Sequence, residues 1–143
     1  MERLEERLEI AAKAYTTLCE VLAIDVPPTV RRDAAIIRLV YTFEAIWKAA
    51  QRFLADVEGV EVGTPNGVIR GCRDTGLLSD EETEAALAIT RDRNLSVHIY
   101  NQELAEQIFS RLPGHVRVLA SWLEAMRRRL GGQPVRPPPP SPR

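Results

Sequence analysis

Long apolar runs are missing from this sequence, and their absence limits where the protein can work. No apolar stretch approaches the roughly 20 residues that a helix needs to cross a bilayer. Residues 1–7 alternate between acidic and basic side chains, whereas a secretory signal peptide would carry an apolar segment. We therefore expect a cytoplasmic protein that does not associate with membranes.

Metal-binding clusters and a strong net charge are also missing. The two cysteines, Cys19 and Cys72, lie far apart in apolar helical segments without a second cysteine or a histidine cluster nearby. This context favours buried thiols. The 19 basic and 20 acidic residues leave a formal net charge of −1, so nothing global attracts the chain to nucleic acid or membranes. We expect no metal and no cofactor, and any RNA contact must be local.

The rest of the composition is that of one globular domain. The chain has 143 residues, of which 45% are hydrophobic and 27% charged, enough for one core and too few for two. Apolar residues recur at helical spacing, and no useful alternating strand pattern occurs. Pro113-Gly114 is expected to kink or divide the last helix. The expected helices cover residues 2–23, 30–57, 65–76, 80–97 and 102–130.

Two helix starts carry capping signals. Thr64 precedes Pro65, which predicts an N-cap followed by proline at the first helical position. Ser79 is followed three residues later by Glu82, which is the pattern of a capping box. Both signals are local and predict the starts of the third and fourth helices.

These segments predict an all-α fold, an antiparallel up-and-down helical bundle of four to six helices that covers residues 1–130. The apolar and aromatic stripes of the helices are wide, which favours a homodimer that buries the excess. Residues 131–143 begin with two glycines and are rich in proline, so we expect a disordered tail.

The polar residues that interrupt the fourth helix form the candidate site. Arg93, Asn94, His98 and Tyr100 lie within residues 91–101, where a packed helix should be apolar. Arg93 and Tyr100 are seven residues apart, so on a helix continued to residue 100 they share a face. His98 borders that face.

The chemistry of this segment permits two interpretations. A neutral imidazole can take and return a proton near pH 7, and a guanidinium can hold two phosphate oxygens, which together suffice for metal-free cleavage of RNA. Alternatively, His98 and Tyr100 cap carbonyls at a helix end, and Arg93 bridges to Asp92 or to a neighbouring helix. The residues by themselves leave both interpretations open.

The pattern Arg-Asn-x-x-x-His-x-Tyr at residues 93–100 resembles the motif of the HEPN superfamily. A longer likeness, over roughly residues 3–130, resembles the nucleotidyltransferase substrate-binding proteins, a HepT-like HEPN branch. The further residues that carry this likeness are Arg31-Arg32-Asp33, Phe43-Glu44, Trp47-Lys48, Val68-Ile69-Arg70, Gly76-Leu77, Asn101, Leu104-Ala105 and Ile108.

The resemblance implies a helical dimer whose two motifs face each other across a cleft, and a partner, a separately encoded minimal nucleotidyltransferase. It makes Arg93 the phosphate-binding cation, His98 the proton-transfer residue and Asn94 the group that orients one of them. Tyr100 matches a position that such partner transferases modify with AMP. The chain lacks the Gly-Ser and Asp-x-Asp elements of a nucleotidyltransferase, so we do not expect it to be the transferase itself.

Three residues of the second helix are further candidates for lining the cleft. Glu44 and Lys48 are four residues apart, so they either line the cleft or form an ordinary intrahelical ion pair. Trp47 either stacks a base or packs in the core or dimer interface.

Two functions follow from the resemblance. The first is a substrate-binding subunit that docks on the transferase and binds a nucleotide or phosphate. The second is a metal-independent ribonuclease toxin that the transferase neutralises as an antitoxin. We favour the first, and whether the chain is an enzyme stays open.

Overall fold

The computed structural model of the chain describes residues 2–131 and contains helices and no strand in that range. The helices are α1 (Glu2–Leu22), α2 (Pro28–Phe53), α3 (Pro65–Asp74), α4 (Asp80–Leu95) and α5 (Gln102–Gly131), with a π-helical turn η1 (Leu54–Glu58) and a 3₁₀ turn η2 (Ser96–His98). The prediction of an all-α bundle is confirmed. The expected proline-rich tail falls outside the described residues from 132 onward.

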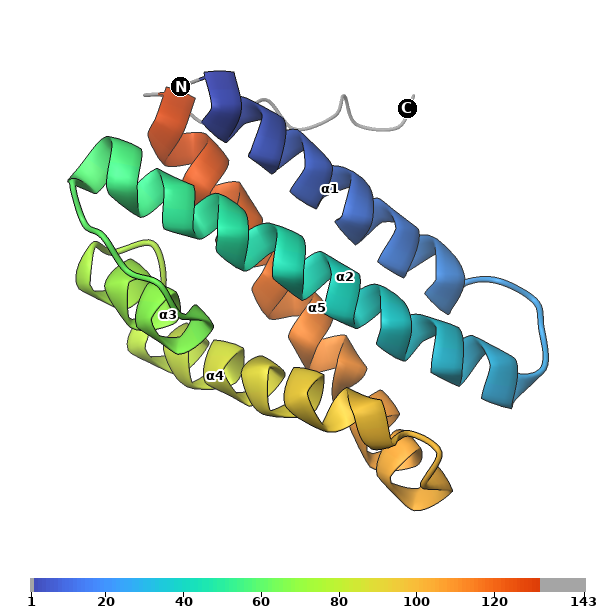
Figure 1. Cartoon of the computed structure of the whole chain (residues 1–143). Helices are drawn as coiled ribbons and strands as arrows, with labels where there is room; N and C mark the ends of the chain where they lie inside the picture. The colour runs from blue at the N-terminus through green and yellow to red at the C-terminus, as the bar shows by residue number, and fades with distance from the viewer. Residues whose placement is uncertain (1, 132–143) are drawn as a thin grey trace.

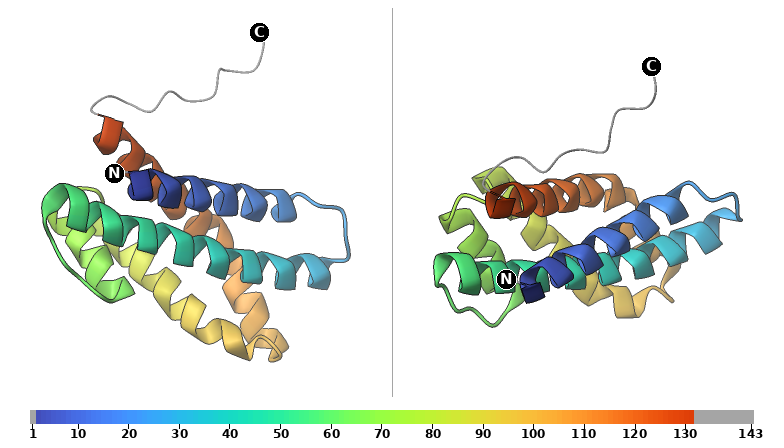
Figure 2. Two further views of the ribbon diagram at one scale, coloured as in Figure 1. Left: turned by 45° about the horizontal axis from the view of Figure 1, so that its top comes forward. Right: turned by 90° about the horizontal axis from the view of Figure 1, so that it is seen from above.

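Helix α2 lies at the centre of the bundle. It packs antiparallel to α1 on one side and contacts α3 and α4 on the other, while α5 passes behind it (Figure 1). The left view of Figure 2 likewise shows α1 and α4 on opposite sides of α2. Because neighbours surround α2, many of its side chains are buried.

Helix α1 buries the stripe that its periodicity predicts. Leu4, Leu8, Ala11 and Leu18 are buried, at steps of three, four and seven residues. The helix ends at Leu22, shortly before the two prolines, and α2 starts with proline at its first position, where a missing N–H costs nothing.

The end of α2 differs from the expectation of a regular helix to residue 57. The α-helix stops at Phe53 and widens into η1, which closes at Gly59 with a left-handed φ of 70°. A Cβ atom at Gly71 would lie 2.9 Å from Leu54 Cδ1, so α3 approaches this turn as closely as a glycine allows. The tight contact with α3 is a tertiary effect that periodicity does not encode.

Both predicted caps are confirmed. The Thr64 hydroxyl accepts a hydrogen bond from the Gly67 N–H at 3.0 Å. At α4 the Glu82 N–H donates to Ser79 Oγ at 3.0 Å, and the Ser79 N–H donates to Glu82 Oε1 at 2.9 Å. These bonds satisfy backbone donors that a helix start leaves without partners.

Helix α5 runs through Pro113 without dividing, so the alternative of two separate helices is wrong. Its buried stripe includes Ile108, Leu112, Leu119 and Trp122, on both sides of the proline. The free energy gained by burying this continuous stripe outweighs the cost of the hydrogen bond that Pro113 removes. No helix among residues 2–131 has both the length and the apolar character needed to cross a membrane.

Candidate functional site

The candidate site lies where α4 ends, and α4 ends earlier than its sequence suggests. The helix stops at Leu95, two residues before its expected end at Val97, so the continuation to residue 100 that would place Arg93 and Tyr100 on one face does not occur. The Ser96 hydroxyl and the Ser96 N–H both donate to the Arg93 carbonyl, which tightens the chain into the 3₁₀ turn.

The guanidinium of Arg93 is held by two side chains. Its Nε donates to Glu44 Oε2 of α2 at 2.7 Å, and its Nη1 donates to Asn94 Oδ1 at 2.8 Å. The guanidinium carbon also lies 5.9 Å from the centre of the Phe43 ring. A guanidinium has five N–H groups, so hydrogen bonds within residues 2–131 leave three of them unused. Arg93 is therefore oriented but still able to bind an anion.

Glu44 pairs with Arg93 and not with Lys48, which corrects the expectation of an intrahelical ion pair. Its second oxygen, Oε1, accepts a hydrogen bond from Trp47 Nε1 at 3.1 Å. Among residues 2–131, Lys48 forms no ion pair within 4.0 Å. Trp47 is only 8% exposed and belongs to the core, so its ring face is not open to a base.

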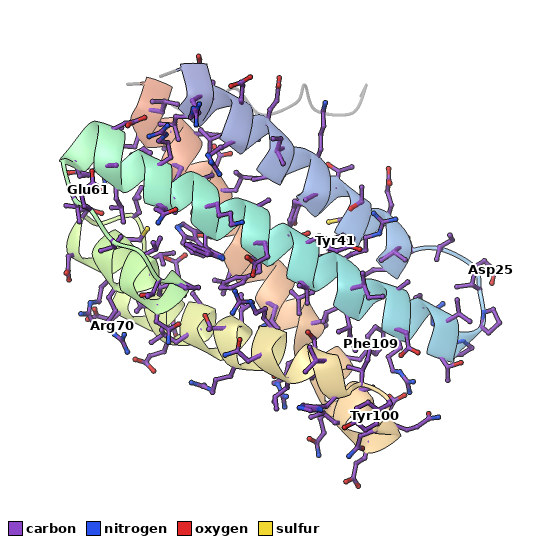
Figure 3. All side chains as sticks on the ribbon, in the orientation of Figure 1. Asp25, Tyr41, Glu61, Arg70, Tyr100 and Phe109 are labelled. Carbon is purple, nitrogen blue, oxygen red and sulfur yellow. The ribbon has the colours of Figure 1, made fainter. Side chains whose placement is uncertain are left out.

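His98 and Tyr100 form a second, separate pair at the surface. His98 Nδ1 lies 3.1 Å from the Tyr100 phenol oxygen, and the two rings meet edge to face with centroids 5.7 Å apart. Tyr100 is 80% exposed, and His98 is exposed as well. Figure 3 shows Tyr100 pointing outward at the end of the bundle where α4 and α5 meet. Both side chains are therefore accessible to a nucleic acid or a modifying enzyme.

The four motif residues thus fall into two groups. Arg93 with Asn94 forms one, and His98 with Tyr100 forms the other. No hydrogen bond or ion pair joins the two groups in the part of the chain that the structure describes. Both groups lie within residues 93–100, which span the end of α4 and the turn η2. A ligand that contacts both the Arg93–Asn94 group and the His98–Tyr100 group must therefore bind on the surface formed by residues 93–100.

An ionic cluster around the buried Asp92, the residue before Arg93, was not foreseen from the sequence. Asp92, 3% exposed, accepts hydrogen bonds from Arg111 Nε at 2.8 Å and Arg111 Nη2 at 2.7 Å. His115 Nε2 lies 2.7 Å from the second of the Asp92 oxygens, Oδ2, and His115 is 5% exposed. The cluster ties α4 to α5 at the residue next to Arg93.

Asp92 stays ionised in this setting. Burial by itself raises the pKa of a carboxyl group, but hydrogen bonds from His115 and Arg111, together with the positive charge of Arg111, outweigh burial and lower the Asp92 pKa to about 2. One sequence signal pointed to the cluster: His115 falls on the apolar stripe of α5, between Leu112 and Leu119. A histidine on such a stripe needs a buried partner.

No group of three or more histidine, cysteine, aspartate or glutamate side chains that could share a metal ion occurs among residues 2–131. The motif residues of the candidate site offer a bound molecule one guanidinium, one imidazole, one phenol and one amide.

Comparison with known proteins adds two solved structures. A crystal structure of a protein from Thermus thermophilus shares 50% identity with a TM-score of 0.78, covering 82% of this chain and 99% of that one. The structure of a mutant of the toxin–antitoxin pair MntA–HpeT has a TM-score of 0.72 at 12% identity, covering 89% of this chain and 98% of that one. The second likeness shows a shared fold. The comparison with curated proteins gave no match.

A family comparison covers most of the chain. Residues 6–128 match the family described as nucleotidyltransferase substrate binding protein like. The matched range includes α2, α4 and every residue of the candidate site. The chain belongs to this nucleotidyltransferase substrate binding protein-like family.

Proposed function

We propose that this protein is the substrate-binding subunit of a two-component nucleotidyltransferase. It forms a homodimer, docks on a separately encoded minimal nucleotidyltransferase, and binds a nucleotide or phosphate with Arg93, Asn94, His98 and Tyr100. The observation that carries the proposal is the state of Arg93, which is oriented by two neighbours and keeps three N–H groups unused by residues 2–131. Membership of the substrate-binding family gives this arginine a fitting ligand class.

Arg93 suits phosphate better than a flexible surface cation would. Glu44 and Asn94 hold its plane, so less side-chain entropy is lost when an anion binds. The carboxylate of Glu44 also offsets the charge of Arg93, which weakens indiscriminate attraction of anions. The pair favours a ligand that brings further contacts, such as those available at His98 and Tyr100.

A second copy of the chain is supported by apolar side chains around the motif. Val97 is 72% exposed, and Leu95 is exposed as well. Large apolar residues that surround a polar motif are typical of a protein contact. A twofold contact through this region would set the two motifs facing each other and enclose the ligand between them.

Nucleotide binding tests the proposal directly. Isothermal titration of the purified protein with AMP and ATP should give binding that weakens at least about tenfold in Arg93→Ala, because a charge-assisted contact is lost. The matched control is Arg91→Ala, an exposed arginine two residues earlier on α4, which should bind like the parent protein. Equal affinity in all three proteins would remove Arg93 from the site.

The partner is tested by co-purification with the product of the neighbouring reading frame. That reading frame should carry the Gly-Ser and Asp-x-Asp elements of a minimal nucleotidyltransferase. A stable complex on size exclusion supports docking, whereas a neighbour without these elements counts heavily against the paired system.

A metal-independent ribonuclease is the second candidate, favoured by the exposure of His98, five residues after Arg93 in the chain. In this reaction the 2′-hydroxyl oxygen attacks the adjacent phosphorus and the bond to the 5′ oxygen breaks. His98 takes the proton of the 2′-hydroxyl and returns it to the leaving 5′ oxygen, while Arg93 binds the phosphate oxygens. The products are a 2′,3′-cyclic phosphate and a 5′-hydroxyl.

RNA cleavage in EDTA decides between the two functions. Cleavage that survives EDTA and disappears in both His98→Ala and Arg93→Ala supports the toxin. Intact RNA with all three proteins leaves the binding subunit as the function.

Tyr100 is the proposed site of modification by AMP. Its phenol is 80% exposed and lies next to His98, so a transferase can reach it and an added phosphate would crowd the site. Co-expression with the partner should add the mass of one AMP unit to the parent protein and none to Tyr100→Phe.

A further inference from the structure

A groove between α1 and α2 adjoins the Arg93–Glu44 pair and is lined in part by Glu44. It contains a cavity of about 310 Å³, whose lining residues are Arg7, Ile10, Tyr41, Glu44, Ala45 and Lys48. A second cavity of about 210 Å³ continues it along α2. The second cavity shares Arg7 and Lys48 with the first and adds Arg52 and Gln51.

The groove has an excess of positive charge near its middle. Neither Arg7 nor Lys48 forms an ion pair or a side-chain hydrogen bond with any residue in the range 2–131. Glu44 already forms an ion pair with Arg93 at 2.7 Å, so its charge does not offset those of Arg7 and Lys48 as well. Two cations that line the same cavity from facing helices repel each other unless an anion lies between them.

The remaining charges of the groove do not cancel this excess. Arg52 lies 3.7 Å from Asp56, so that pair is neutral. Glu61 lines the second cavity only, and Glu44 is the single acidic residue that lines the first. The first cavity therefore presents Arg7 and Lys48 as its two unpaired charges.

An exposed aromatic ring lies beside these cations. Tyr41 is 57% exposed on α2 and lines the same cavity as Ile10 of α1, which is 60% exposed. In Figure 3, Tyr41 lies on α2 at the side toward α1. A ring face next to unpaired cations matches the two parts of a nucleotide, since aromatic rings stack bases and cations bind phosphates.

We propose that the α1–α2 groove binds a nucleoside phosphate, free or within single-stranded RNA. The base stacks on Tyr41 against Ile10, and the phosphate lies between Arg7 and Lys48. The inference rests on the proposed function, from which it takes the class of ligand, a nucleotide. It adds a second contact region to the one at Arg93. Glu44 connects the two, because it lines the groove and binds Arg93.

The direct test is binding of a short, fluorescently labelled 2′-O-methyl RNA, followed by polarisation at several salt concentrations. The probe lacks the attacking hydroxyl, so cleavage cannot disturb the measurement. The double variant Arg7→Gln/Lys48→Gln should bind at least about tenfold more weakly. The slope of log affinity against log salt should fall in magnitude by about 0.7, since the single phosphate contact between Arg7 and Lys48 contributes about 0.7 on a single strand.

A matched control removes the same charge elsewhere. Arg70→Gln/Arg117→Gln changes two exposed arginines, on α3 and α5, and neither of them lines the groove. This variant should retain the parent affinity and most of the salt slope. Figure 3 shows Arg70 on the α3 side of the bundle, away from α1. If both double variants weaken binding equally, general electrostatics explains the effect and the proposal fails.

Stacking is tested separately from charge. Tyr41→Ala should lower the affinity at least about fivefold, and Tyr41→Phe should restore it, because the ring face and not the hydroxyl carries the contact. Equal binding by Tyr41→Ala and the parent protein contradicts the role given to the ring.

Competition distinguishes the two sources of the ligand. Displacement of the probe by AMP identifies the groove as a site for a free nucleotide. Displacement by unlabelled RNA but not by AMP identifies it as a path for a strand. Both results support a nucleoside phosphate site.

Two further outcomes separate this inference from the proposed function. Loss of binding in Arg93→Ala with none in the groove variants keeps the function and overturns the groove. Loss of binding in the groove variants with none in Arg93→Ala keeps the groove and overturns the role proposed for Arg93. Analytical ultracentrifugation of every variant completes the test: a changed oligomeric state at unchanged affinity assigns the groove to a contact between copies and overturns the proposal.

Discussion

Asp92 Oδ2 lies 2.7 Å from His115 Nε2, and this contact joins the last turns of α4 to the middle of α5. Arg111 completes the cluster through two further hydrogen bonds to the same carboxylate. Asp92 precedes Arg93 directly in the chain, so the rotation of α4 that buries Asp92 also turns Arg93 toward Glu44 on α2. The cluster is therefore expected to matter for stability and for the orientation of the site.

Removing the buried charge should destabilise the protein. Asp92→Asn leaves Arg111 and His115 without the carboxylate that both contact, and we expect a loss of about 3 kcal/mol in the free energy of unfolding. Urea denaturation followed by circular dichroism measures the change. Asp74→Asn, an exposed aspartate at the end of α3, should change the free energy by less than about 0.5 kcal/mol. A loss below about 1 kcal/mol in Asp92→Asn would mean that the cluster contributes little.

The same cluster should make stability depend on pH in the acid range. The pKa of Asp92 is lowered to about 2 in the folded protein, from about 3.9 in an unfolded chain. Between these values the unfolded state binds more protons, so the stabilisation is complete above about pH 4 and is lost as the pH falls toward about 2. Urea denaturation at a series of pH values should show the difference between the parent protein and Asp92→Asn shrinking over this window. A constant difference would contradict the lowered pKa.

The Glu44–Arg93 ion pair should add little to stability, which makes it a safe target for functional variants. Both side chains are partly exposed, and measured couplings of such pairs are below about 1 kcal/mol. A double-mutant cycle with Glu44→Ala, Arg93→Ala and the combination measures the coupling by urea denaturation. A coupling of several kcal/mol would show that Arg93 is needed for the fold and would weaken any functional reading of its variants.

The two thiols should differ in reactivity. Burial raises the pKa of Cys72 to about 12, although Trp122 Nε1 donates to its sulfur at 3.4 Å and opposes the shift. Cys19 is only partly buried. Titration of the native protein with a disulfide reagent at about pH 8 should modify Cys19 and leave Cys72 intact until the protein is unfolded. A Cys19→Ser variant that still reacts at once in the native state would contradict the burial of Cys72.

Local signals in the sequence predicted the helices well. Thr64 and Ser79 start α3 and α4 because a hydroxyl that accepts from a nearby N–H acts over three residues and needs no distant partner. The buried stripe of α1 followed from spacing for the same reason, since helical period alone decides which side chains share a face.

Distant partners explain the features that the sequence did not predict. Periodicity alone extended α4 beyond Leu95, while the Ser96 bonds to Arg93 and the start of α5 end it there. Glu44 looked like a partner for Lys48 four residues away, yet it pairs with Arg93, forty-nine residues away. Spacing along one helix cannot show which side chain a second helix will bring closer.

The sequence by itself determined the helical class, most helix starts, and the identity of the motif residues, because these depend on hydrophobic period, capping and residue type. The tertiary packing of α2, α4 and α5 alone decided that Arg93 is held by Glu44 and that the buried Asp92 pairs with Arg111 and His115. The physical reason is that ion pairs and hydrogen bonds act over a few ångströms, so their partners depend on how the helices pack and not on their separation along the chain.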